Sequence, residues 1–213
     1  MRVTCLGDSI CFGYGVAPRD AWLALLADRL AADFPGIKVA NAGVSGEVAR
    51  EGLGRLSRVL GWGRPDLLYV QFGLNDAALG ISPPDYVRTV REIVRRALEG
   101  GTHSVLVGGN HPVCVGQERS LPGAALYQRA VRAFNEALRR EMASQPPPVF
   151  FADVERLCES LGGEREQSAL LQGDGVHLSE EGNRAYARLL CPLFQDRLRA
   201  LGENPGGESR GGL

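Results

Sequence analysis

Short apolar runs alternate with longer amphipathic stretches along most of the chain. The short runs are rich in apolar and β-branched residues and predict strands; they cover Arg2 to Leu6, Ile37 to Ala40, Leu67 to Phe72, Ser104 to Gly108 and Val149 to Phe151. The longer stretches predict helices over Asp20 to Phe34, Gly46 to Leu60, Pro84 to Leu98, Ala124 to Ala143 and Ser179 to Leu201. Strands that alternate with helices are typical of an α/β fold, in which right-handed crossovers build a parallel sheet.

The last predicted helix marks the end of the folded part. Ser179 is a typical N-cap, and Glu180 and Glu181 place acidic groups in the first turn, where they interact well with the helix dipole. Residues 202–213 are rich in Gly, Glu and Ser and have little to bury. We expect one domain over residues 1–201 and a disordered tail over residues 202–213.

Composition excludes several classes of protein. A net charge of −1 over 213 residues gives no basic surface for nucleic acid. The five cysteines, at positions 5, 11, 114, 158 and 191, have no CxxC spacing and several lie in apolar runs, so we expect reduced, packed thiols. No apolar segment reaches membrane-spanning length and no signal-peptide core is present. These features indicate a soluble, cytoplasmic protein; they indicate no oligomeric state.

Small and polar residues follow each predicted strand. In chain order they are Gly7-Asp8-Ser9, Asn41-Ala42-Gly43, Gly73-Leu74-Asn75-Asp76 and Gly109-Asn110-His111-Pro112, and Asp174-Gly175-Val176-His177 precedes the last helix. Parallel α/β sheets bind ligands at the carboxyl ends of their strands. We therefore expect these segments to meet at one edge of the sheet.

Four of these segments resemble the sequence blocks of the SGNH (GDSL-type) hydrolases: Gly7-Asp8-Ser9-Ile10, Gly43, Gly73-Leu74-Asn75-Asp76 and Asp174-Gly175-Val176-His177. The resemblance covers residues 1 to about 200. Together with the strand and helix pattern, it implies a three-layer α/β sandwich with a flavodoxin-like, five-stranded parallel sheet and helices on both faces. It also implies a serine esterase that needs no metal or cofactor and acts on a small-molecule ester.

By this resemblance Ser9 is the nucleophile, His177 the general base and Asp174 the carboxylate that orients the imidazole. Gly43 and Asn75 join the backbone N–H of Ser9 in the oxyanion hole. The chemistry suits these residue types, because a serine hydroxyl needs a base to take its proton and a developing oxyanion needs neutral N–H donors.

Other residues near the strand ends have ordinary interpretations. His111 is a candidate substrate-binding residue, although a solvated loop histidine fits the sequence equally well. Asp8 and Asp76 are expected to cap or brace turns. Ser45 imitates a nucleophile elbow, but Glu47 stands where that motif needs glycine.

The sequence does not identify the substrate. Short acyl or acetyl esters are favoured, because the loops at the site carry no long amphipathic insertion that could form an acyl tunnel. A thioesterase or lysophospholipase using the same site is the alternative. Two other classes compete: a metal-dependent phosphoesterase, disfavoured by only three histidines, and a non-enzymatic nucleotide-binding module, disfavoured by the missing phosphate-loop lysine.

Overall fold

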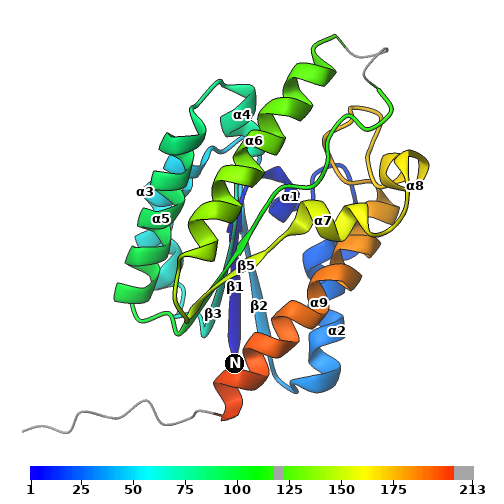
Figure 1. The fold of residues 1–213 in the computed structure, drawn as a ribbon. Coiled ribbons are helices and arrows are strands. Elements are labelled where there is room, and N and C mark those ends of the chain that lie inside the picture. The colour runs from blue at the N-terminus through cyan, green and yellow to red at the C-terminus, as the bar shows by residue number, and fades with distance from the viewer. Residues whose placement is uncertain (118–121, 204–213) are drawn as a thin grey trace, which may run out of the picture.

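The computed structural model describes residues 1–117 and 122–203, and its centre is a parallel sheet (Figure 1). In these residues the sheet has five strands: β1 (Arg2–Gly7), β2 (Lys38–Gly43), β3 (Leu67–Gln71), β4 (Ser104–Gly108) and β5 (Val149–Ala152). Their spatial order is β2-β1-β3-β4-β5, and every neighbouring pair is parallel. This is the flavodoxin-like order, so the predicted sheet is confirmed.

Helices cover both faces of the sheet, which confirms the predicted three layers. One face carries α2 (Trp22–Asp33) and α9 (Glu180–Glu203), and the other carries α3 (Ala49–Gly61), α5 (Pro83–Glu99) and α6 (Ala124–Ala143) (Figure 1). Helix α9 includes Gly202 and Glu203, the first two residues of the predicted tail. The rest of that tail, residues 204–213, lies outside the described residues.

Two apolar clusters hold these layers together. Strand β3 contributes to both, because successive side chains of a strand point to opposite faces. Tyr69 packs with Trp22 and Phe194 in the cluster under α2 and α9, whereas Leu68 and Val70 pack in the cluster under α3, α5 and α6. Both faces of the central strands are therefore buried, as their continuous apolar runs predict.

The short helical segments between the main elements were not predicted. They are α1 (Ser9–Phe12), α4 (Leu74–Ala78), α7 (Val154–Glu159), α8 (Glu164–Ala169) and the 3₁₀ turn η1 (Pro18–Asp20). Segments of one or two turns are too short to show a helical period of apolar residues. Two of them, α1 and α4, carry predicted site residues, namely Ser9 and Asn75.

Strand β2 also differs from the prediction. It was expected to end at Ala40, but its pairing with β1 continues to Gly43, which lies opposite Gly7. Helix α3 correspondingly begins at Ala49, whereas Gly46 was expected to open it. The loop that follows β2 therefore starts at Val44 and contains Gly46.

Candidate active site

Ser9 is held where β1 turns into α1. It is the first residue of that helix, and Asp8 caps it by accepting a hydrogen bond from the backbone N–H of Ile10 at 2.9 Å. The turn needs glycine at position 7, because a Cβ there would overlap Cys11 Sγ and the Gln71 carbonyl. The first N–H groups of a helix have no partner within it, so the N–H of Ser9 points outward from the helix start.

His177 lies between Ser9 and Asp174. Its Nε2 is 3.0 Å from Ser9 Oγ and its Nδ1 is 2.6 Å from Asp174 Oδ2. Partial burial raises the pKa of Asp174, but hydrogen bonds from the ring and backbone of His177 outweigh it, and the net pKa lies below its usual value. An ionised carboxylate can only accept, so Nδ1 carries the proton and Nε2 is left to accept the hydroxyl proton of Ser9.

The spacing from Asp174 to His177 follows from a tight turn. Oxygen Oδ1 of Asp174 accepts the backbone N–H groups of Val176 at 2.9 Å and His177 at 3.0 Å, while Oδ2 remains for the imidazole. Gly175 adopts a φ of +72°, a conformation that glycine reaches without strain. One carboxylate thus shapes the loop and orients the ring.

Asn75 lies at the start of α4, directly after β3. Its Nδ2 donates to the carbonyl of Glu47 at 2.9 Å, which ties the loop after β2 to the end of β3. The primary amide has two N–H groups. A second donor therefore remains on Asn75 beside that loop.

Gly43 does not have the position expected of it, and the prediction that its N–H helps to form an oxyanion hole is wrong. That N–H donates to Asn41 Oδ1 at 2.8 Å within β2. A Cβ at Gly43 would collide with the backbone of Phe12, so this glycine allows α1 to pack against β2. The role was assigned to Gly43 by the resemblance to the SGNH hydrolases, whereas the structure places this residue inside β2, paired with β1.

Gly46 is the glycine that sequence reasoning missed. It has a φ of +85°, and a Cβ there would meet nothing within 4 Å, so it faces open space. Among residues 1–117 and 122–203, no acceptor is bonded to the N–H of Gly46. Its loop is tied to the carbonyl of Gly7 through Val44 and to Asn75 through Glu47, which places it between the ends of β1 and β3.

His111 is not available to a substrate, and the prediction that it binds one is wrong. Only 1% of its surface is exposed. Its Nδ1 is 2.9 Å from the hydroxyl of Tyr186, and its Nε2 is 2.8 Å from the carbonyl of Val176. Both ring nitrogens are thus engaged by the protein, next to the loop that carries His177.

Two buried carboxyl groups lie under the site. Burial raises the pKa of Asp8 to about 7, against the lowering effect of its hydrogen bond from Ile10, and nearby Asp76 raises it further. Burial likewise raises the pKa of Asp76 to about 6, although both its oxygens accept the N–H of Ala49 at the start of α3. Asp8 caps its own turn, as the sequence predicts, whereas Asp76 caps α3, a helix from another part of the chain.

Tyr14 is a site residue that the sequence did not single out. Its ring lies 4.4 Å from that of His177, centroid to centroid, at an angle of 39°. The side chain of Tyr14 is half exposed, and that of Asp174 is 44% exposed. The imidazole is thus packed on one side while the site opens to solvent.

In residues 1–117 and 122–203, no three His, Cys, Asp or Glu side chains gather so that they could hold a metal ion. None of the helices in the same residues combines the length and apolar character needed to cross a membrane. The five cysteines are buried thiols outside any disulfide, as expected.

Ser9, His177 and Asp174 are hydrogen-bonded in series at the carboxyl edge of a parallel sheet, an arrangement typical of serine hydrolases. Residues 5–185 match the model of the GDSL-like lipase/acylhydrolase family. The chain belongs to this family, and its class is that of the carboxylic ester hydrolases.

Individual relatives agree with this classification. The chain is 27% identical to Esterase TesA of Pseudomonas aeruginosa, over 81% of this chain and 77% of that protein. It is 29% identical to Thioesterase 1/protease 1/lysophospholipase L1 of Escherichia coli K12, over 89% of this chain and 81% of that one. Its fold is similar to that of a lipase/acylhydrolase from Enterococcus faecalis, with a TM-score of 0.76, 23% identity and coverage of 92% and 96%.

Proposed function

We propose that the protein hydrolyses carboxylic esters through a covalent acyl-enzyme formed on Ser9, with His177 as general base and Asp174 as its partner. The observation that supports this most is the series of contacts from Ser9 Oγ through His177 to Asp174 Oδ2, at 3.0 and 2.6 Å. Only neutral Nε2 can take the hydroxyl proton, and the contact to Asp174 fixes that tautomer.

The reaction proceeds in two halves. Ser9 Oγ attacks the carbonyl carbon as its proton passes to His177 Nε2, and the tetrahedral intermediate collapses when the alcohol leaves with that proton. Water then attacks the acyl ester on Ser9 while His177 takes a proton from the water. The second collapse releases the carboxylic acid and returns the proton to Ser9.

Three N–H groups are proposed to stabilise the oxyanion: those of the Ser9 and Gly46 backbones and the second N–H of Asn75. The outward N–H of Ser9, the open surroundings of Gly46 and the tie from Asn75 to Glu47 support this set. Fixed donors of this kind act mainly on the transition state, where the negative charge is largest.

Short acyl or acetyl esters are the proposed substrates. The exposure of Asp174 and Tyr14 beside His177 supports an open site, and each methylene left in water forgoes about 0.8 kcal/mol of transfer free energy. The alternative is hydrolysis of thioesters or lysophospholipids, which are activities in the name of the Escherichia coli relative.

A kcat/KM series on 4-nitrophenyl esters, measured below their micellar limits, decides which acyl-chain length is preferred. A steady rise through ten or more acyl carbons would contradict the short-chain proposal.

A reducing compartment such as the cytoplasm is the proposed location. Its support is that all five cysteines are buried thiols outside any disulfide, since disulfides persist mainly in oxidising compartments. Fractionation of the producing cells, with the protein followed by antibody, tests this.

The mechanism is tested by labelling with a fluorophosphonate. Ser9→Ala removes the attacking oxygen and leaves the rest of the site intact, so we expect normal folding and no covalent label. Esterase activity should be unchanged by EDTA, because no proposed step uses a metal. Full labelling of the Ser9→Ala variant would refute the nucleophile, whereas loss of activity in EDTA and recovery with Zn²⁺ or Mn²⁺ would favour a metal-dependent phosphoesterase.

A further inference from the structure

Hydrogen bonds to its backbone carbonyl groups hold the loop that carries His177 in place. Four successive carbonyl oxygens, from Gly175 to Leu178, each accept a hydrogen bond. Gln172 supplies two of the donors: its N–H bonds the carbonyl of His177 at 2.7 Å, and its Nε2 bonds that of Leu178 at 2.9 Å. These two bonds lie within the loop itself and therefore do not fix it to the sheet.

Nδ2 of Asn183 on α9 also donates to the carbonyl of Leu178, at 3.2 Å. The donors to the carbonyls of Gly175 and Val176 come from the segment after β4. The N–H of Cys114 donates to the carbonyl of Gly175 at 2.6 Å, and Nε2 of His111 lies 2.8 Å from the carbonyl of Val176. Cys114 has a φ of 51°, a conformation that non-glycine residues seldom adopt. The surroundings therefore hold the backbone of this segment in a strained form that points an N–H at the loop.

The direction of each hydrogen bond at His111 is determined. A carbonyl can only accept, so the Nε2 facing Val176 carries a proton. Burial lowers the pKa of His111 to about 4, against the raising effect of the Val176 carbonyl, so the ring is neutral at working pH and its Nδ1 is an acceptor. The hydroxyl of Tyr186 donates to Nδ1 and itself accepts from Nε2 of Gln71 at 3.2 Å.

This chain of bonds starts inside the sheet. Gln71 is the last residue of β3, and its Nε2 also donates to the carbonyl of Gly109 at 2.8 Å. It is 1% exposed, as is His111, and Tyr186 is equally buried on α9. A series of hydrogen bonds thus connects the core to the residue just before His177. It runs from Gln71 through Tyr186 and His111 to Val176.

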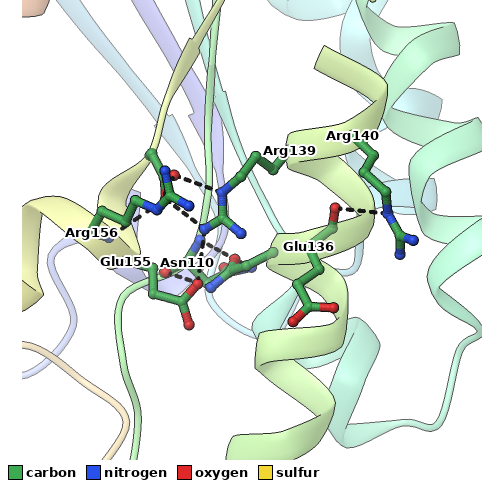
Figure 2. A network of polar contacts seen from close by, with 8 residues as sticks. Asn110, Glu136, Arg139, Arg140, Glu155 and Arg156 are labelled. Atoms are coloured by element: carbon green, nitrogen blue, oxygen red, sulfur yellow. Dashed lines mark hydrogen bonds and ion pairs between the residues drawn. The ribbon is translucent and has the colours of Figure 1, made fainter. Parts of the chain in front are cut away.

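The backbone beside His111 is also anchored. Asn110 and Asn135 of α6 form a reciprocal pair, with the N–H of Asn110 donating to Asn135 Oδ1 at 2.8 Å and Asn135 Nδ2 donating to the Asn110 carbonyl at 2.9 Å. Figure 2 shows Asn110 in this network, next to Arg139, which bonds Asp153 at 2.7 and 2.9 Å and Glu155 at 3.1 Å. The network ties α6 to the segment after β4 and to α7 and its N-cap, Asp153.

We propose that His111 is a positioning residue which, through the carbonyl of Val176, sets the alignment of His177 between Ser9 and Asp174. The inference rests on the proposed role of His177 as general base. A histidine suits this place because it brings a buried donor to Val176 without a charge. A lysine or arginine would put a positive charge beside the imidazolium that forms on His177 during catalysis, and would oppose it.

A pair of amide variants tests the proposal. In His111→Gln the terminal N–H group can reach the position of Nε2, whereas in His111→Asn the shorter amide loses the donor to Val176 and keeps polar atoms near Tyr186. We expect kcat to fall about 10-fold or more in His111→Asn, with KM changed less, because transition-state alignment is lost. In His111→Gln we expect kcat within about threefold of the wild type, since one donor bond is retained.

The controls separate positioning from stability. Rates are divided by the concentration of sites titrated with fluorophosphonate and are measured well below each variant's Tm. Val59→Ala, in the apolar cluster under α3, α5 and α6, should lose stability and keep its kcat. Unchanged kcat per titrated site in His111→Asn, with His177→Ala inactive, would overturn this inference and leave the proposed function standing; an active His177→Ala would refute the proposed function itself.

A measurement on the unmutated protein covers the case in which His111→Asn does not fold. The ¹⁵N shifts of the ring nitrogens, read by long-range proton–nitrogen correlation at pH 7, report the tautomer of each histidine. We expect a proton on Nε2 of His111 and an acceptor at Nδ1. A proton on Nδ1, or on both nitrogens, would overturn the inference, because the direction of the bonds would then be wrong.

Discussion

Replacing Asp8 by asparagine should make the protein more stable at neutral and alkaline pH. One oxygen of Asp8 caps α1, but in the described part of the chain the other, Oδ2, is buried without a hydrogen-bond partner. Asparagine is as good an N-cap as aspartate, so the cap survives. The substitution removes a carboxyl group whose charged form is disfavoured in the folded protein.

The size of the effect follows from the pKa of Asp8. Burial raises this pKa from 3.8 to about 7, a shift of about 3 units, which corresponds to about 4 kcal/mol. Because the folded-state pKa is the higher one, the stability from this group is fully present below pH 3.8 and is lost as the pH rises to about 7. The wild type thus bears the full cost of the buried charge only above pH 7.

Urea unfolding of both proteins at intervals from pH 4 to pH 8 measures this cost. The free energy of unfolding of Asp8→Asn minus that of the wild type should rise from pH 4 to pH 8, by up to about 4 kcal/mol in all. Taking the difference cancels the titration of groups common to both proteins. Asp28→Asn, at an exposed position on α2, controls for the loss of one negative charge and should change stability by less than about 0.5 kcal/mol. A difference that does not vary with pH would refute the reasoning.

Three further outcomes are expected. Asn75→Ala should lower kcat roughly 10²-fold with a smaller change in KM, because it removes a donor to the oxyanion; an effect on KM alone would make Asn75 a substrate-binding residue. Gly43→Ala should lower the free energy of unfolding by about 1–3 kcal/mol, because its Cβ meets the backbone of Phe12, and equal stability in denaturant would contradict the packing described here. Activity should fall on acidification, because protonated His177 cannot accept a proton; a flat profile down to pH 4 would exclude a histidine base.

The sequence by itself determined the architecture. Apolar runs of strand length alternate with amphipathic stretches, and these local patterns survive folding because each element buries its own apolar face in the core. The strands after which Ser9 and Asn75 follow were therefore placed to within a residue or two. The pairing of Asp174 with His177 was implied by the resemblance to the SGNH hydrolases, and their spacing allows it, because a single tight turn brings them together.

Only the tertiary structure decided which groups face the open site. Strand β2 extends to Gly43 because it pairs with β1, a partner distant in sequence, so the open loop carries Gly46 and Gly43 becomes a packing residue. The sequence around His111 is typical of a loop histidine, but in the structure Tyr186 on α9 and the carbonyl of Val176 bond both of its ring nitrogens. Both errors have the same physical origin: pairing and burial depend on contacts between segments far apart in the chain, which a local pattern of residues does not contain.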